Sequence, residues 1–207
     1  MRQATRYLAG AGVSRGLLTE LAEVVLLALG LYLVINFAVQ TVHVMGSSMY
    51  PTVQDQDYLV ATKVDYHLHA PQRGDIVIMR DPLDPSRDFI KRIIAVPGDR
   101  LLIRDSRVYV NGHQVQEGYL RHMPWTQYTT WPVNPPSNPQ GQLMGPDEYF
   151  VMGDNRDHSD DSRIFGPIHR DEIEARAWIR ILPLSQAGPI GGPMPTLSPK
   201  ITLPNAS

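Results

Sequence analysis

The sequence predicts a mainly β domain that follows a single N-terminal membrane-spanning helix. One observation is an apolar stretch near the N-terminus, from Leu21 to Val44. A second is a series of short segments after residue 57 that are rich in β-branched residues and separated by Gly, Pro, Asn and Asp, which is the pattern of strands joined by turns. The third is the length of 207 residues, which suffices for one sizeable core or two small fused ones.

The stretch 21–44 is long enough to cross a membrane. A helix of that length spans about 36 Å, more than the roughly 30 Å of a hydrocarbon core. Three arginines precede it, and no Lys or Arg lies between residues 16 and 60. Because positive charge stays on the cytoplasmic side, we expect 1–20 to be a cytoplasmic N-terminus, 21–44 a single-pass anchor in the cell membrane, and the rest to be extracytoplasmic.

Two other interpretations fit an apolar stretch near an N-terminus: a cleavable signal peptide and a buried core helix. Residues 37–43, which follow the apolar run, contain no small-x-small cleavage site. The polar lead of twenty residues is also long for a signal peptide. Both observations favour an uncleaved anchor.

Short apolar runs after the anchor predict the strands of one β-rich domain, residues 45–182. Asn111-Gly112, between two alternating segments, is the signal of a two-residue hairpin turn. The runs predicted to be strands are 58–64, 75–79, 89–96, 101–103, 108–110 and 148–152.

Two segments depart from this strand pattern. Residues 117–147 are rich in Pro and contain Trp125 and Trp131, and we interpret them as a surface excursion packed by its own aromatic side chains. The alternative is that these tryptophans lie at the membrane interface, where Trp is enriched. Residues 183–207 are rich in Pro and Gly without periodicity, which predicts a disordered tail.

The composition excludes several classes of function. A formal net charge of -2 provides no basic surface, so nucleic acid is not an expected partner. The absence of cysteine excludes disulfides, thiolate metal sites and a cysteine nucleophile. His67 and His69 have no third candidate ligand nearby in the sequence, and we expect no metal and no cofactor.

Four segments contain the candidate chemistry. Gly46, Ser47 and Ser48 precede a Pro-Thr turn, and such a tight loop offers free backbone N–H groups for an oxyanion. Ser48 lies within about 15 Å of Val44, which places a nucleophile there close to the membrane. Chemistry alone does not choose between the two serines, and a Gly-Ser hinge is the alternative. The four segments are 46–52, 73–77, 91–99 and 153–163.

Lys91 is expected to point toward an apolar face. In the predicted strand 89–96, period-two alternation places Lys91 with Phe89, Ile93 and Ala95. Burial disfavours the charged ammonium and lowers its pKa, so that a neutral amine could accept a proton from a serine hydroxyl near pH 7. The alternative is an edge lysine with its stem on apolar surface and its head in water.

The segment 153–163 combines four aspartates with arginine and serine. A calcium loop fits it badly, because Ser162 stands where glycine is needed and Ile168 where a bidentate carboxylate is needed. A hydrogen-bonded brace is the simpler interpretation, with Ser159 and Ser162 as hydroxyl donors to an amine.

Together the four segments closely resemble the bacterial type I signal peptidase (leader peptidase) family of Ser/Lys serine proteases, whose motifs they match in order and rough spacing. The resemblance implies that Ser48 is the nucleophile and Lys91 the general base. It further implies that Ser159 orients the lysine, and that Asp161 and Arg163 support the site structurally.

The same resemblance implies a signal-peptidase-like β-rich fold with its active site at the membrane face. Its substrates would be preprotein signal peptides with small residues at positions -1 and -3 of the cut, and the secretion machinery is a further candidate partner. Where some members have a serine two residues before the nucleophile, this chain has Gly46. The oxyanion hole would therefore rest more on backbone groups, notably the Ser48 N–H.

We therefore expect a membrane-bound serine endopeptidase that acts through an acyl-enzyme. A rival within the same class is a Ser/His enzyme that uses His43 or His158, but Lys91 in its matching segment disfavours it. A rival of a different class is a catalytically silent, membrane-tethered β-domain that binds exported chains.

Overall fold

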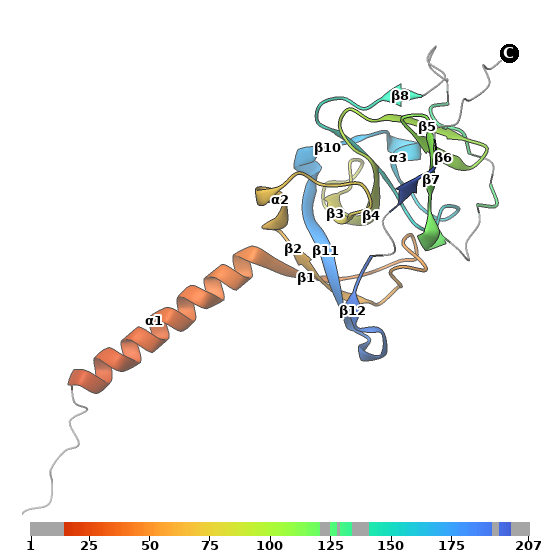
Figure 1. Ribbon diagram of the computed structural model, residues 1–207. Helices are drawn as coiled ribbons and strands as arrows, with labels where there is room; N and C mark the ends of the chain where they lie inside the picture. The colour runs from red at the N-terminus through yellow and green to blue at the C-terminus, as the bar shows by residue number, and fades with distance from the viewer. Residues whose placement is uncertain (1–14, 121–124, 128, 134–140, 192–194, 200–207) are drawn as a thin grey trace, which may run out of the picture. The chain divides into compact units, whose positions relative to one another are not determined.

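The computed structural model describes residues 15–120, 125–127, 129–133, 141–191 and 195–199 (Figure 1). The chain divides into two compact units, Met1–Ala38 and Val39–Ser207, and each is described by itself. The first unit contains one helix and the second contains the strands. The prediction of a mainly β domain after one apolar helix is confirmed.

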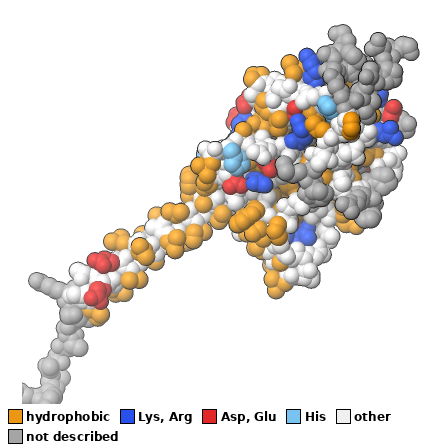
Figure 2. All heavy atoms as spheres, viewed as in Figure 1, with side chains coloured by type: hydrophobic (Ala, Val, Ile, Leu, Met, Phe, Trp, Pro, Cys, Tyr) orange, Lys and Arg blue, Asp and Glu red, His pale blue; other side chains and the backbone are white. Residues whose placement is uncertain are grey.

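The helix of the first unit, α1, runs over Arg15–Ala38. Within it, Gly16–Ala38 is long and apolar enough to cross a membrane, by a criterion that signal sequences and buried core helices also meet. None of the residues in this window is buried, so α1 is not a core helix within the part of the chain that the structure describes. Figure 2 shows hydrophobic side chains along most of its visible face, with acidic ones near its N-terminal end.

The anchor was predicted to extend to Val44, whereas α1 ends at Ala38. The next residues form strand β1, Val39–His43, which pairs antiparallel with β2, Tyr58–Thr62. Three of the five residues of β1 are β-branched, which favours a strand. The apolar stretch of the sequence therefore spans two different elements.

The second unit consists of two antiparallel sheets. The first has the strand order β1-β2-β11-β3-β4-β9-β10, with β12 paired to β11, and the second has the order β13-β7-β6-β5-β8. The other strands are β3 Ile76–Arg80, β4 Asp88–Ala95, β5 Arg100–Arg104, β6 Arg107–Val110, β7 His113–Gln116, β8 Gln142–Leu143, β9 Glu148–Met152, β10 Ile168–His169, β11 Ile173–Leu182, β12 Gly188–Pro189 and β13 Thr196–Leu197. The short helices are α2 Asp65–Leu68, η1 Gly118–Leu120, α3 Ser162–Phe165, η2 Arg170–Glu172 and η3 Leu184–Gln186.

Most predicted strands are present, but the longest one was missed. The six predicted runs correspond to β2, β3, β4, β5, β6 and β9, and Asn111-Gly112 forms the turn between β6 and β7 with φ of 55° and 80°. Strand β11 lies between β2 and β3 in the first sheet. Glu174 and Ala175 are weak strand formers. Apolar residues at 173, 175, 177, 179 and 181 nevertheless alternate with charged ones at 174, 176 and 180, which is a strand signal that the sequence analysis overlooked.

The segment after Leu182 was predicted to be a disordered tail, and its described residues, 183–191 and 195–199, are arranged differently. Strand β12 pairs with β11 of the first sheet, and β13 pairs with β7 of the second. Strand pairing uses the backbone C=O, which every residue has, and the backbone N–H, which every residue except Pro has. Composition therefore gave no sign of these two short strands.

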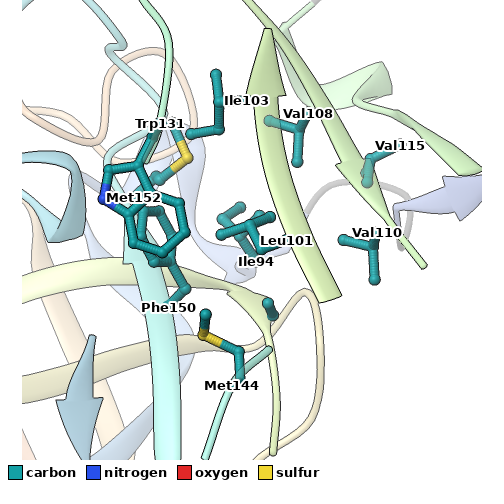
Figure 3. Packing of buried hydrophobic residues seen from close by; sticks show 11 residues of the cluster. Ile94, Leu101, Ile103, Val108, Val110, Val115, Trp131, Met144, Phe150 and Met152 are labelled. Carbon is teal, nitrogen blue, oxygen red and sulfur yellow. The ribbon is translucent and has the colours of Figure 1, made fainter. Parts of the chain in front are cut away.

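One apolar cluster joins the two sheets (Figure 3). It contains Phe150 of β9, which is fully buried, and Trp131, which is 7% exposed. Their ring centroids lie 4.5 Å apart. Trp125 packs against the same cluster. The described part of the excursion 117–147 thus places its tryptophans against the core, which agrees with a packed surface loop rather than with a membrane interface.

Because Phe150 fills the space between the sheets, replacing it with Ala should leave a cavity. We expect Phe150→Ala to lower the free energy of unfolding by about 3–5 kcal/mol, measured by urea unfolding of the detergent-solubilised chain. Leu83 is 73% exposed, so Leu83→Ala is the control and should change stability by less than about 0.5 kcal/mol. Equal effects of the two substitutions would contradict this assignment of the core.

Candidate active site

The loop between β1 and β2 contains both candidate serines. The strand pairing continues one step beyond β1, because the Val44 N–H donates to the Asp57 carbonyl at 2.8 Å and the Gln56 N–H donates to the Val44 carbonyl at 2.9 Å. We call the residues that follow, 46–55, the serine loop. Met49 and Val53 within it are 1% and 0% exposed, so buried side chains fix the loop on the core.

Lys91 of β4 meets Ser48 directly. Its Nζ donates to Ser48 Oγ at 3.0 Å, and Lys91 is only 2% exposed. The predicted apolar face is confirmed for Phe89 and Ile93, which belong to one cluster, and Lys91 Nζ lies 4.7 Å from the Phe89 ring centroid. Ala95 instead joins the cluster between the sheets, because the register of β4 shifts between Ile93 and Ala95.

Burial lowers the pKa of Lys91 to about 8, from 10.5 for an ordinary lysine. The negative charges of Asp161 and Asp160 oppose this shift without cancelling it. No carboxylate among the described residues forms a salt bridge with Lys91. With a pKa of about 8, the amine is neutral in about one molecule in ten at pH 7 and in about half at pH 8. An ordinary lysine would be neutral in fewer than about one in a thousand at pH 7, so burial brings Lys91 into the range that a general base requires.

The neighbouring Arg92 is buried too, but it has a full set of partners. Its Nε and Nη2 donate to the two carboxylate oxygens of Asp154 at 2.8 and 2.7 Å, and its Nη1 donates to the Gly74 carbonyl at 3.0 Å. Burial alone would lower the pKa of Arg92, but the hydrogen bonds and charge of Asp154 raise it above its ordinary value. Asp154 also accepts a hydrogen bond from Thr52 Oγ1 at 2.5 Å.

The sequence analysis gave Arg92, Asp154 and Thr52 no role. Arg92 alternates with Lys91 in a strand that is apolar on both sides, and that pattern could have predicted a buried arginine in need of a carboxylate. The aspartate itself, which lies 62 positions away, could not be chosen from four candidates by sequence.

The segment 153–155 holds the backbone of the two serines. The Asn155 N–H donates to the Ser48 carbonyl at 2.9 Å, and Asn155 Nδ2 donates to the Ser47 carbonyl at 3.1 Å. A Cβ at Gly153 would clash with the Ser48 carbonyl and the Ser159 hydroxyl. Glycine is therefore needed here for close approach, and Asn155 is a further residue that the sequence analysis missed.

Ser159, Asp161 and Arg163 lie around Gly153 in different roles. The buried Asp161 carboxylate accepts from the Gly153 N–H at 3.0 Å and from Arg163 Nε and Nη2, both at 2.8 Å. Ser159 Oγ is buried and has no hydrogen-bond partner among the described residues. Asp161 thus joins Gly153 to Arg163 through hydrogen bonds, whereas among the described residues no hydrogen bond joins Ser159 to the lysine.

Ser47 and Gly46 are exposed, in contrast to Lys91. The N–H groups of Ser47 and Ser48 have no acceptor among the described residues. Gly46 adopts a φ of +106°, a region that favours glycine. The serine loop therefore offers the free backbone donors that its sequence predicted.

Among the described residues, neither histidine of the rival mechanism forms a hydrogen bond with the serine hydroxyl. His43 Nε2 is hydrogen-bonded to Gln56 Oε1 at 3.0 Å, and its ring stacks on Tyr58 with centroids 4.5 Å apart. His158 lines the same groove as Ser48. Among the described residues, Lys91 is the only side chain that hydrogen-bonds Ser48 Oγ.

Ser48 and Lys91 lie in a groove with a volume of about 730 Å³. One wall is formed by residues 40–48, which comprise most of β1 and the start of the serine loop, and the other by residues 86–91 of β4 and the preceding turn. Ile78, His158 and Asp160 complete the lining. The groove is large enough for several residues of an extended peptide, since pockets for drug-sized ligands span about 300–1,000 Å³.

The family model and the curated relatives agree on one family. A family model described as signal peptidase, peptidase S26, matches residues 18–182. The chain is 36% identical over 170 residues to a probable signal peptidase I-2 of Synechocystis sp., covering 79% of this chain and 71% of that protein. It is 33% identical over 163 residues to signal peptidase IB of Staphylococcus aureus, covering 75% and 84%. A crystal structure of a signal peptidase I from Enterococcus faecalis matches with a TM-score of 0.43 and 33% identity, covering 52% of this chain and 97% of that one.

The lowered pKa of Lys91 has a consequence for stability. Below pH 8 the folded chain must bury a charge that the unfolded chain leaves in water, and this penalty disappears as the pH rises toward 10.5. We expect Lys91→Met to be more stable than wild type at pH 6 by about 2 kcal/mol, which is about 3 for the pKa difference less about 1 for the lost hydrogen bond. The gain should vanish by pH 10.

Urea unfolding of the detergent-solubilised chain at both pH values provides the measurement. Lys63→Met is the matched control, because Lys63 is partly exposed and its replacement should have the same effect at pH 6 and pH 10. A Lys91→Met difference that does not change with pH would contradict a lowered pKa.

Proposed function

The chain belongs to the signal peptidase family, peptidase S26, and from this premise we propose that it is a membrane-bound serine endopeptidase that removes N-terminal signal peptides from preproteins after small-x-small sites. Ser48 is the nucleophile and Lys91 the general base. The observation that carries this assignment is the hydrogen bond of 3.0 Å between Lys91 Nζ and Ser48 Oγ in a groove wide enough for a peptide.

The reaction begins when neutral Lys91 accepts the Ser48 hydroxyl proton as Oγ attacks the carbonyl carbon of the scissile peptide bond. The Lys91 ammonium then donates its proton to the departing amine, and an acyl-enzyme remains. Lys91, neutral again, deprotonates a water molecule that attacks the acyl carbon. Hydrolysis restores Ser48 and releases the signal peptide.

The negative charge on the carbonyl oxygen is stabilised by backbone donors of the serine loop. The free Ser48 N–H provides this stabilisation without a side chain, which matters because Gly46 has none. An oxyanion donor contributes about 3–4 kcal/mol to lowering the barrier. Asn155 supports this donor indirectly, since it holds the carbonyls of Ser47 and Ser48.

Helix α1 anchors the enzyme to the cell membrane in a single pass. The arginines that precede it favour a cytoplasmic N-terminus and an extracytoplasmic catalytic domain. This orientation suits substrates that are exported across the membrane. The proposed partners of the enzyme besides these substrates are the lipid bilayer and the secretion machinery. Catalysis needs no metal and no cofactor, because the base and the nucleophile come from the chain itself.

The assignment of nucleophile and base is tested by cleavage of a precursor with an Ala-x-Ala site by the detergent-solubilised chain. Ser48→Ala and Lys91→Ala should each lower kcat by at least about 10⁴-fold. In the wild type, kcat/KM should rise with pH through about 8, because Lys91 acts only when it is neutral, and should level off above that value.

Matched controls separate this mechanism from its rivals. Ser47→Ala and Lys63→Ala should keep activity within about tenfold of wild type, since neither removes the nucleophile or the base. Full activity in Lys91→Ala combined with its loss in His43→Ala or His158→Ala would establish a histidine base instead. An inactive wild type with intact binding of precursor would favour the silent β-domain.

The topology is tested by cysteine labelling, because the chain has no native cysteine. We expect a membrane-impermeant maleimide added to intact cells to label Leu83→Cys, whose position is 73% exposed. Ser14→Cys should be labelled only after the membrane is permeabilised. Labelling of Ser14→Cys in intact cells would reverse the proposed orientation.

A further inference from the structure

The two ends of the serine loop are joined by a hydrogen bond to a side chain instead of by a pair of backbone groups. The β1–β2 pairing ends with the contacts of Val44 to Gln56 and Asp57. One step further, the Gly46 N–H donates to Asp55 Oδ1 at 2.7 Å. Asp55 therefore takes the place of the next backbone partner at the point where Gly46 turns away from the strand direction.

The space next to the Gly46 Cα is open, so side-chain packing at that atom does not restrict its conformation. Gly46 has a φ of +106°, and a Cβ built on it would meet no described atom within 4 Å. A glycine without packing constraints samples a wide range of backbone angles. Its hydrogen bond to Asp55 restricts that range.

The backbone of Gly46 leads into the peptide that carries the Ser48 N–H. That N–H shares one planar peptide with the Ser47 carbonyl, which accepts hydrogen bonds from Asn155 Nδ2 and from the Tyr50 N–H, both at 3.1 Å. A change in the backbone angles of Gly46 would displace this peptide and weaken both hydrogen bonds. Asp55 thus acts at the start of the serine loop, while Asn155 holds the carbonyls of Ser47 and Ser48 from the other side.

Asp55 is itself held in place by neighbouring side chains. Gln56 Nε2 donates to both of its carboxylate oxygens, at 3.3 and 3.4 Å, and Gln56 Oε1 is bonded to His43 at 3.0 Å. The bond from Gly46 is the largest of the influences that lower the pKa of Asp55. The carboxylate therefore stays ionised across the pH range in which Lys91 titrates.

We infer that Asp55 is a positioning residue of the oxyanion hole: by accepting the Gly46 N–H it holds the start of the serine loop, and together with Asn155 it keeps the Ser48 N–H in place as the oxyanion donor. This inference rests on the proposed function, because it concerns stabilisation of the oxyanion in the same reaction. In this chain the hydrogen bond to Asp55 restricts the backbone at Gly46, a residue that has no side chain to donate to the oxyanion.

The test compares Asp55→Ala with Asp55→Asn in cleavage of the Ala-x-Ala precursor by the full chain in detergent. Asp55→Ala removes the acceptor and should lower kcat by about tenfold, the effect of one hydrogen bond of ordinary strength. KM should change by less than about twofold and the midpoint of the pH profile should stay at that of wild type, because Asp55 does not line the groove and Lys91 is unchanged. Asp55→Asn keeps an acceptor oxygen and should retain at least about half of the wild-type kcat.

Glu148→Ala is the matched control. Glu148 Oε2 accepts the Gly145 N–H at the same distance, 2.7 Å, but it lies at the far end of β9 from Gly153 and does not line the groove. Its loss should affect stability alone and leave kcat within about twofold of wild type. Thermal unfolding of each variant accounts for any loss of folded protein.

The outcomes distinguish this inference from the proposed function. Wild-type kcat in Asp55→Ala, or equal losses in the Ala and Asn variants, would overturn the positioning role while the effects of Ser48→Ala and Lys91→Ala leave the mechanism intact. A tenfold loss in Glu148→Ala would also overturn it, since a structural bond elsewhere would then have the same effect. Retained activity in Ser48→Ala would overturn the proposed function regardless of Asp55.

Discussion

Strand β4 buries two cations side by side, and their different surroundings determine the site. Arg92 is compensated by both oxygens of Asp154, so it remains charged and ties distant segments together. Lys91 has only the Ser48 hydroxyl as a close polar partner among the described residues, so burial lowers its pKa to about 8. A buried charge with a partner stabilises structure, whereas a buried amine without one becomes a base.

The Arg92–Asp154 pair also holds together segments that lie far apart in the sequence. Asp154 accepts from Thr52 at one end of the serine loop, and the adjacent Asn155 binds the backbone of Ser47 and Ser48. Breaking such a buried pair by removing one partner costs about 3–5 kcal/mol. The ion pair therefore holds β4, which contains Lys91, against the segment that binds the backbone of Ser48.

Local patterns in the sequence predicted the strands with clear alternation and the hairpin at Asn111-Gly112, and alternation also placed Lys91 on an apolar face. Resemblance to a family selected Ser48 over Ser47, which chemistry alone could not do. Strand β11 carries apolar alternation too, and that signal was overlooked. What could not be predicted depends on contacts between distant segments: the short strands β12 and β13, and the partner of Arg92. The position of Ala95 was misjudged because a register shift in β4 interrupts the alternation.

The most direct measurement is an NMR titration of the lysine side chains in the folded, detergent-solubilised chain. The chain has three lysines, Lys63, Lys91 and Lys200, so the Lys91 signal can be assigned as the one missing in a Lys91→Met sample. We expect its amine to titrate near pH 8, while an exposed lysine titrates near 10.4. A Lys91 midpoint at 10 or above would leave a neutral amine in at most about one molecule in a thousand at pH 7, and it would contradict the assignment of Lys91 as the base.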